Sequence, residues 1–361
     1  MKWPNHGGQP ETIKQLFHIN HNKPVLDFSA NLNPLGPPKW LNDALQESYN
    51  TVTSYPDPTY SNTTAAVAKY EGLQQENVLV TNGGAEAIFL VAKYFENGKA
   101  CIVHPTFLEY ERASKHYHIQ VEELYYDIAN GFSLPWSQIK EKLVDIDVLF
   151  LCRPNNPTGT VIAEKEIKQL LEVGKEAETY IVIDEAFVDF LTDDNSSLSG
   201  WLIQYPNLVL LRSLTKMYTI PGLRIGYVMA HQKIISILKQ EQIPWSINSI
   251  VDFIVPKLLA DTSYVDDTKA WLNKESQFIH NTLSKMDFYL SPFQVNFYLL
   301  RDLKRPDETE KLFTFLLENG IVTRHTHNFK GLNGEYLRLA IRSHEENEQL
   351  VKVLQKWRDE M

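Results

Sequence analysis

Short apolar runs that alternate with helical patterns constrain the fold of this chain more than any other feature. Six such runs occur in its central part, at 78–81, 100–103, 147–152, 180–183, 207–211 and 225–229. Helical patterns lie between several of them, as at 85–97 and 163–177. A strand that is buried on both faces has this continuous apolar character, and parallel strands need helical crossovers. We therefore expect an α/β fold with a mainly parallel sheet between two layers of helices.

The two ends of the chain follow other patterns. The first 60 residues are rich in Pro, Asn and Gly, and they predict loops around one short helix near 37–48. The region 233–286 predicts mostly helix, with a break at Pro244. Beyond it, strand and helix patterns alternate at 296–301, 307–319, 335–341 and 344–359. A smaller α+β domain is therefore expected at the C-terminal end.

These patterns divide the chain into three parts. An N-terminal arm that contributes to the small domain covers 1–48, a large domain covers 49–270, and a small domain covers 271–361. The second boundary falls in a helical region, where one long helix can belong to both domains.

Charge and cysteine content narrow the class of protein. The chain has 35 Lys and Arg against 45 Asp and Glu, and its net charge of −10 argues against nucleic acid or an anionic membrane surface as the main partner. Cys101 and Cys152 lie in strand-like runs, which predicts buried free thiols. No apolar run approaches the roughly 20 residues of a membrane helix, and no secretion signal is recognisable. We expect a cytoplasmic protein, and we assign no metal ligand.

Polar residues follow two neighbouring apolar runs at the point where each run ends. Asp184 and Glu185 follow 180–183, and such a pair can be a metal site, an acid/base pair or the N-cap of a helix. Lys216 follows 207–211, with Ser213 and Thr215 beside it and an arginine, Arg224, eight residues later. Hydroxyls and a guanidinium suit a phosphate monoester, and a lysine near positive charge suits a covalent nucleophile.

Two glycine-containing turns complete the set of candidates. The run 78–81 leads through Asn82-Gly83-Gly84-Ala85 into a helix, so backbone N–H groups at a helix start can hold an anion. This turn lacks both the Walker Gly-Lys-Ser/Thr and the dinucleotide G-x-G-x-x-G pattern. The second turn, Arg153-Pro154-Asn155-Asn156-Pro157-Thr158-Gly159, is either structural or uses the Asn156 amide as a donor.

Taken in order, these motifs resemble a known family. Asn156-Pro157-Thr158-Gly159, then Asp184-Glu185-Ala186-Phe187, then Ser213-x-Thr215-Lys216 with Arg224 eight residues on, resemble the fold-type I pyridoxal-5′-phosphate (PLP) enzymes of the aspartate aminotransferase superfamily. The resemblance runs nearly end to end. It implies PLP as the cofactor, a large domain with a mainly parallel seven-stranded sheet between helices, and a smaller α+β C-terminal domain with an N-terminal arm.

The resemblance also implies roles around the cofactor ring. Lys216 forms a Schiff base with PLP and moves protons at the substrate, while Asp184 pairs with the pyridine nitrogen. Asn156 donates to the phenolic oxygen, and Phe107 stacks on the ring.

Further residues match the family's phosphate and substrate contacts. The cofactor phosphate is held by Gly84 and Ala85 amides, Ser213, Thr215 and Arg224. Tyr55 matches a tyrosine that reaches the phosphate of a neighbouring subunit, which implies a homodimer with shared active sites. Arg338 matches the arginine that binds the substrate α-carboxylate bidentately.

Two branches of the superfamily compete, histidinol-phosphate aminotransferase and threonine-phosphate decarboxylase. His6-Gly7-Gly8, the stretch Asp27 to Gly36, and Phe187 in place of a tyrosine all resemble the decarboxylase. That branch implies decarboxylation of O-phospho-L-threonine to aminopropanol phosphate, which supplies the cobalamin side chain. Amino transfer from histidinol phosphate to 2-oxoglutarate, and decarboxylation of O-phosphoserine, are the alternatives.

The substrate phosphate needs cations of its own. Arg324 lies fourteen residues before Arg338, a spacing that resembles the decarboxylase, and we expect it to hold this phosphate together with His6. Arg342 lies on the same face of the strand as Arg338, where it either assists or pairs with an acid. Asn156 is expected to contact the substrate as well. His325 and His327 are interpreted as surface polar residues.

Overall fold

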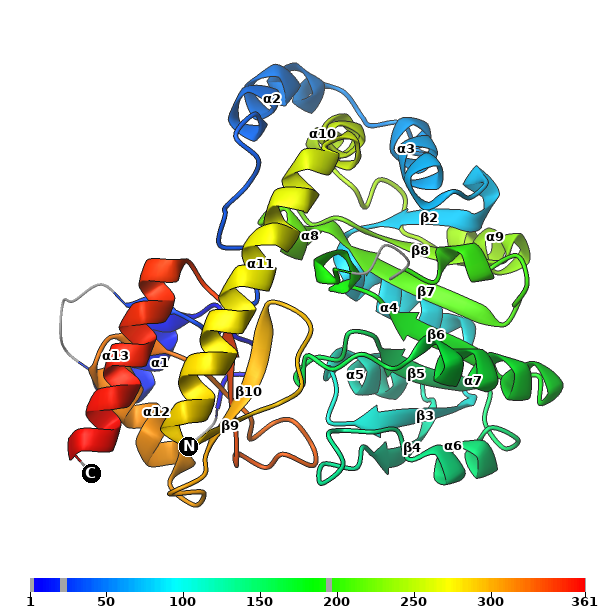
Figure 1. Ribbon diagram of the computed structural model, residues 1–361. Coiled ribbons are helices and arrows are strands. Elements are labelled where there is room, and N and C mark those ends of the chain that lie inside the picture. Colours follow the sequence, from blue (N-terminus) through cyan, green and yellow to red (C-terminus); the bar gives the residue numbers. More distant parts are fainter. Residues whose placement is uncertain (1–2, 20–24, 193–196, 361) are drawn as a thin grey trace.

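A seven-stranded sheet lies at the centre of the larger part of the molecule (Figure 1). The computed structural model describes residues 3–19, 25–192 and 197–360. The strands are β2 (Val78–Thr81), β3 (Lys99–His104), β4 (Gln120–Tyr125), β5 (Val148–Cys152), β6 (Tyr180–Asp184), β7 (Leu208–Ser213) and β8 (Gly226–Ala230). They are ordered β2-β8-β7-β6-β5-β3-β4. Strand β8 runs antiparallel to both of its neighbours, and all other pairs are parallel. The predicted α/β class and mainly parallel sheet are confirmed.

Helices cover both faces of this sheet because its strands are apolar on both faces. On one face, α4 (Gly83–Tyr94), α5 (Glu109–His116) and α9 (Gln232–Glu241) pack on side chains such as Ile102, Phe150 and Val182. On the other face lie α3 (Ser61–Glu71), α6 (Trp136–Lys142) and α7 (Glu164–Glu176). Successive strand residues point to opposite faces, so the two apolar clusters divide the strands between them.

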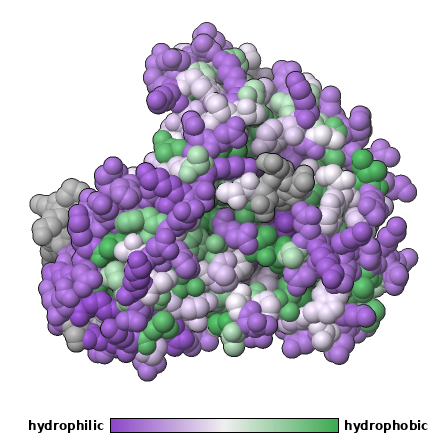
Figure 2. Space-filling model, viewed as in Figure 1, coloured by the Kyte–Doolittle hydropathy of each residue, from purple (hydrophilic) through white to green (hydrophobic). Residues whose placement is uncertain are grey.

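A second, antiparallel sheet forms the smaller part of the molecule. Its strands are β9 (Phe288–Leu290), β10 (Phe297–Asp302), β12 (Arg324–His325) and β13 (Leu337–Ala340), in the order β12-β13-β10-β9. The helices α12 (Thr309–Glu318) and α13 (His344–Glu360) belong to this part, and Figure 2 shows mainly hydrophilic side chains over α13. The predicted C-terminal α+β region is confirmed.

The first part of the N-terminal arm packs on this smaller part. It contains α1 (Pro10–Leu16) and β1 (Leu26–Asp27), and β1 pairs in parallel with β11 (Ile321–Val322). Residues 1–2 and 20–24 of the predicted arm lie outside the described residues.

One long helix, the 22-residue α11 (Thr262–Leu283), connects the two parts of the molecule. The remaining α-helices among the described residues are α2 (Leu41–Ser48), the short α8 (Leu214–Met217) and α10 (Ser249–Ala260), which directly precedes α11. Figure 1 shows α11 running from the large sheet to the small one. The boundary expected at residues 270 and 271 falls inside this continuous helix, and the three-part division stays a prediction.

Two further expectations concern the cysteines and the membrane. Cys101 and Cys152 are buried and free, which confirms the predicted thiols. Within the described ranges, none of the helices combines the length and apolar character that crossing a bilayer requires.

A buried ion cluster fixes the sheet beside the carboxyl ends of β6 and β7. The Arg212 guanidinium lies 2.6 Å from Asp189 Oδ1, 3.3 Å from Glu71 Oε1 and 3.5 Å from Glu185 Oε2. Tyr227 donates its hydroxyl hydrogen to Glu71 at 2.5 Å. Burial raises the pKa of Glu185 to about 7, although Arg212 opposes this shift. These acids therefore depend on Arg212 to remain charged inside the protein.

Replacing Arg212 by methionine should destabilise the fold. The substitution leaves several acids without their buried cation, and we expect the free energy of unfolding to fall by about 3–5 kcal/mol. Urea titration followed by circular dichroism measures this. The matched control is Lys304→Met, which removes an exposed ion pair with Asp287 and should change stability by less than about 1 kcal/mol. Equal effects of the two substitutions would contradict a stabilising role of the cluster.

Candidate active site

The carboxyl edge of the large sheet brings together residues from three distant segments. Asp184 ends β6, Ser213 ends β7, and Lys216 lies in α8 directly after it. Gly226 at the start of β8 is paired with Ser213 on one side and with Thr81 on the other. This register places the turn before α4 next to the lysine segment.

The turn before α4 forms a tight cradle with Arg224. Gly83 has a φ of +75°, and a Cβ there would lie 2.4 Å from Arg224 Nη2. A Cβ on Gly226 would lie 2.6 Å from Arg212 O and 2.9 Å from Gly84 N. The chain therefore needs glycine at both positions for the backbone and the guanidinium to approach so closely.

Hydroxyl groups complete this cradle. Ser213 Oγ and Thr215 Oγ1 are 2.9 Å apart, and Ser213 faces the Gly84 backbone at the start of α4. Ala85 follows in the first turn of the same helix. Helix-start amides, two hydroxyls and a guanidinium fit the phosphate group of PLP.

Lys216 is partly buried among positive charges. Burial, together with the positive charges of Arg338 and Arg224, lowers the pKa of its amine to about 8, while Asp184 opposes this shift. Among the described residues, its Nζ makes no hydrogen bond or ion pair. A substantial fraction of this amine is therefore neutral and nucleophilic near neutral pH.

The backbone around Lys216 is held by the N-terminal segment. Asn33 N donates to Lys216 O at 3.2 Å, and Asn33 Nδ2 donates to Met217 O at 3.0 Å and to Thr268 Oγ1 at 2.8 Å. Asn33 thereby ties the N-terminal segment to the lysine segment and to α11.

Asp184 is buried and is oriented by two donors. Its Oδ2 accepts a 2.7 Å hydrogen bond from the Tyr110 hydroxyl, and its Oδ1 accepts one of 2.9 Å from Ala186 N. Burial raises the pKa of this carboxyl, against the opposing effects of Tyr110 and Lys216. A buried carboxylate of this kind calls for a cationic N–H partner, and the pyridinium nitrogen of PLP fits that requirement.

Tyr110 is a site residue that sequence reasoning missed. It lies in the first turn of α5, three residues after Phe107, and its ring centroid is 5.9 Å from the Phe107 ring. A tyrosine in a helix carries no sequence signal of its own. Only the packing of α5 on the large sheet shows that its hydroxyl reaches Asp184.

Arg338 links the two parts of the molecule. From β13 it donates through Nη1 to Asn156 Oδ1 at 2.6 Å and through Nη2 to Ser29 O at 2.7 Å. Its Nε is buried without a partner among the described residues. Burial and the neighbouring Arg324 lower the pKa of Arg338 to about 9.

Arg324 is paired with Arg338 across β12 and β13 and is equally buried. It donates to Pro4 O at 3.0 Å, to Asn5 O at 2.6 Å and to Asn328 Oδ1 at 2.8 Å. Burial lowers its pKa to about 10. In the described part of the chain, no carboxylate lies within ion-pair distance of either arginine, so both retain an unneutralised buried charge.

The N-terminal arm lies directly beside these arginines. Gly7 contacts the Ser29 backbone so closely that a Cβ would fall 2.1 Å from Ser29 O, which also accepts from Arg338. Gly8 N donates to Ser29 Oγ at 2.8 Å. His6 Nε2 lies 3.2 Å from Glu109 Oε1, and its ring centroid is 6.2 Å from the ring of Phe107. The His6-Gly7-Gly8 stretch therefore belongs to the same site as Lys216.

The remaining expectations have mixed outcomes. Arg342 pairs with Glu346 at 3.0 Å, so the structure shows the acid pairing that the sequence left open. Tyr55 is 85% exposed, and its ring centroid lies 5.3 Å from that of Trp245 in a tilted arrangement. Phe187 is buried against Phe297. The surface interpretation of His325 is wrong: it is buried beside Arg324, contacts Pro4 O, and burial lowers its pKa to about 3.

Comparison with known proteins places this geometry among characterised families. The model of the family "Aminotransferase class I and II" matches residues 23–354. A putative threonine-phosphate decarboxylase from Caldanaerobacter subterraneus subsp. tengcongensis is 34% identical, covering 90% of this chain and 88% of that protein. The threonine-phosphate decarboxylase of Salmonella typhimurium is 32% identical, covering 97% and 95%.

A solved structure matches the fold closely. The histidinol-phosphate aminotransferase from Clostridium acetobutylicum superposes with a TM-score of 0.88 at 31% identity, covering 93% of this chain and all of that one. The similarity extends over both sheets, so the two-part architecture belongs to a known fold.

The unusual acidity of Lys216 can be measured in cofactor-free protein. A neutral amine acylates and a protonated amine does not, so labelling of Lys216 by acetic anhydride should rise with pH through a midpoint near 8. Peptide mass spectrometry gives the extent of labelling at each pH. Arg338→Met should move the midpoint upwards because it removes a repelling positive charge.

The matched control is Arg342→Met, because the Arg342 guanidinium already pairs with Glu346. It should leave the midpoint unchanged. A midpoint at the ordinary lysine value in the unaltered protein would contradict the proposed electrostatics.

Proposed function

This chain belongs to the aminotransferase class I and II family, and from that premise we propose that it is a PLP-dependent decarboxylase of O-phospho-L-threonine. The products are CO2 and aminopropanol phosphate, the precursor of the cobalamin side chain. The names of two relatives, both covered over most of their length, support this reaction.

One structural observation carries the proposal. Arg338 and Arg324 are buried on paired strands without carboxylate partners in the described chain, and Arg338 acts electrostatically on Lys216. Burying a guanidinium without a counter-charge is costly, so the pair calls for an anionic ligand. O-phospho-L-threonine carries a carboxylate and a phosphate on a small skeleton, and its amine suits the neighbouring Lys216.

The chain's own residues would divide the work as follows. When bound, PLP withdraws electrons from the bond that breaks at the substrate α-carbon. Asp184 would hold the pyridinium nitrogen, and Gly84, Ser213 and Arg224 would hold the cofactor phosphate. Phe107 would stack on the ring.

Substrate contacts would come from the smaller part of the molecule and the arm. Arg338 would bind the α-carboxylate bidentately, while Arg324 and His6 would hold the substrate phosphate. Phosphate oxygens would then replace the Pro4 and Asn5 carbonyls on Arg324. Lys216 would move the proton that the α-carbon takes up after CO2 leaves.

Histidinol-phosphate aminotransferase is the second candidate, favoured by the structural match to the Clostridium acetobutylicum enzyme. Histidinol phosphate has a phosphate but no carboxylate, so it satisfies Arg324 and leaves Arg338 for the oxo acid. Phe187 supports the decarboxylase, because it has no hydroxyl to offer the cofactor oxygen. O-phosphoserine lacks one methyl, worth roughly 1–3 kcal/mol of discrimination, so it should react more slowly.

We also propose a homodimer with shared active sites. The rings of Tyr55 and Trp245 contact each other although both are exposed to solvent, and Tyr49, Val52 and Ile243 are exposed as well. Exposed aromatic and aliphatic side chains of this kind are typical of a protein interface. Sedimentation velocity should show a dimer that Tyr55→Ala weakens. A monomer at micromolar concentration would contradict the proposed homodimer.

The cytoplasmic location of the protein stays a prediction.

A paired assay on PLP-loaded protein tests the reaction. With O-phospho-L-threonine and no oxo acid, we expect CO2 release and aminopropanol phosphate, detected by mass spectrometry. With L-histidinol phosphate and 2-oxoglutarate, we expect no glutamate. Glutamate formation without CO2 would assign the aminotransferase reaction instead.

Two variants connect this activity to the site. Arg324→Met should raise KM for O-phospho-L-threonine at least about tenfold, since hydrogen bonds to charged groups are worth about 1.5–3 kcal/mol. KM for unphosphorylated L-threonine should change little, and Arg342→Met serves as the matched control. Equal effects of Arg324→Met on both substrates would remove Arg324 from the phosphate site. Lys216→Ala should abolish turnover.

A further inference from the structure

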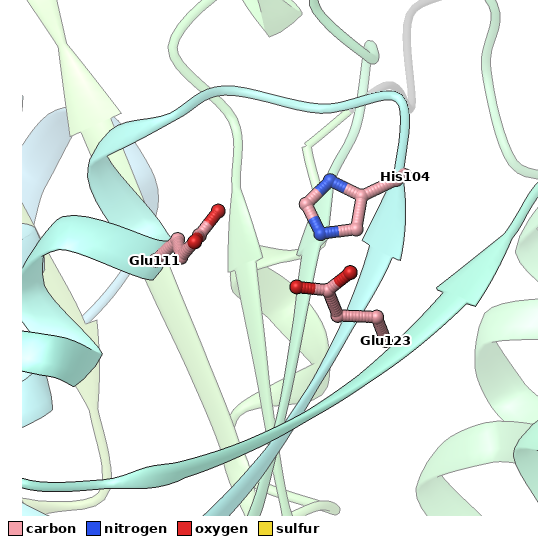
Figure 3. Close-up of side chains that lie close together, drawn as sticks. All are labelled: His104, Glu111 and Glu123. Carbon is pink, nitrogen blue, oxygen red and sulfur yellow. The ribbon is translucent and has the colours of Figure 1, made fainter. Parts of the chain in front are cut away.

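A second group of ligating side chains lies outside the candidate active site. His104 ends β3, Glu111 lies in the first half of α5, and Glu123 lies in β4 (Figure 3). One ligand atom of each lies within 4.8 Å of the others. Figure 3 shows the three side chains converging from three different elements.

The histidine of this group has an unsatisfied buried nitrogen atom. His104 is 4% exposed, and its Nε2 is buried with no hydrogen-bond partner among the described residues. In Figure 3 this edge of the ring faces the two carboxylates.

Lys330 currently balances the two carboxylates. Its Nζ lies 2.9 Å from Glu111 Oε2 and also forms an ion pair with Glu123. The ammonium leaves His104 Nε2 without a partner. The Lys330 side chain is 39% exposed, so the lysine can move into solvent at a modest cost in free energy. A cation that also bonded the imidazole would satisfy all three groups at once.

We propose that His104, Glu111 and Glu123 bind a divalent transition-metal ion such as Zn²⁺, in competition with Lys330. Zn²⁺ accepts both imidazole nitrogen and carboxylate oxygen as ligands, and water would complete the tetrahedron. Zinc ligands lie about 2.0–2.2 Å from the metal, and the partly exposed glutamate side chains can rotate to reach that distance. Mg²⁺ and Ca²⁺ prefer oxygen ligands and suit the site less well.

The proposal is tested by titrating PLP-loaded protein with Co²⁺, a spectroscopic substitute for Zn²⁺. Ligand-field bands in the visible spectrum report binding, and added Zn²⁺ should displace the Co²⁺. His104→Ala should weaken binding at least about tenfold. Lys330→Leu should strengthen it by about tenfold, because it removes the competing cation.

His327→Ala is the matched control, since His327 pairs with Glu310 in the smaller part of the molecule. It should leave the Co²⁺ affinity unchanged. Glu123→Gln, at a partly exposed position, should weaken binding as His104→Ala does, and it keeps the test valid if the buried histidine variant does not fold.

Two results would overturn the proposal. One is unchanged Co²⁺ affinity in both His104→Ala and Glu123→Gln, which would place the metal elsewhere. The other is the absence of binding to Lys330→Leu at millimolar Co²⁺. Thermal unfolding gives an independent readout, because Zn²⁺ that binds the folded protein should raise the Tm of Lys330→Leu more than that of His104→Ala.

Discussion

Buried positive charge at the carboxyl edge of the large sheet is the constraint on which the rest of the site depends. Arg338 and Arg224 lower the pKa of Lys216, and Arg324 lowers that of Arg338, so these cations repel one another. Asp184 and Asp27 offset this repulsion only in part, and neither Arg338 nor Arg324 forms an ion pair among the described residues. The arrangement is therefore a receptor for several anionic groups, and the phosphates and carboxylate of a PLP enzyme with a phosphorylated amino acid match it.

Arg212, which is also buried near this edge of the sheet, has its charge neutralised within the protein. Arg212 precedes Ser213 on β7, and its side chain points to the other face of the sheet. There it meets Asp189, Glu71 and Glu185 at ion-pair distances. Arg212 is thus a structural residue, because acidic side chains of the protein neutralise its charge. Arg338 has no such ion pair among the described residues and is available to bind an anionic ligand. The two arginines therefore differ in role because of the side chains around them and not because of their residue type.

The sequence predicted what depends on local pattern and missed what depends on packing. Continuous apolar runs identified six strands of the large sheet, but β4 escaped because its side chains are largely exposed at the sheet edge. Motif order predicted Lys216, Asp184 and Arg338 as site residues, and these roles stay predictions. Motif order did not identify Tyr110 or the burial of His325, because each depends on contacts between segments far apart in sequence. The ligand group around His104 is hidden for the same reason.

Asn156 connects the cofactor side of the site to the substrate side. Its Oδ1 is committed to Arg338, so the amide can donate to a ring oxygen only through Nδ2. The other Arg338 donor contacts Ser29 O, the atom against which Gly7 packs. The position of the arm therefore bears on Arg338, the arginine that we propose binds the substrate carboxylate. PLP enzymes select a reaction by orienting one α-carbon bond against the ring, so on this proposal a shift of the arm would alter the orientation of the substrate.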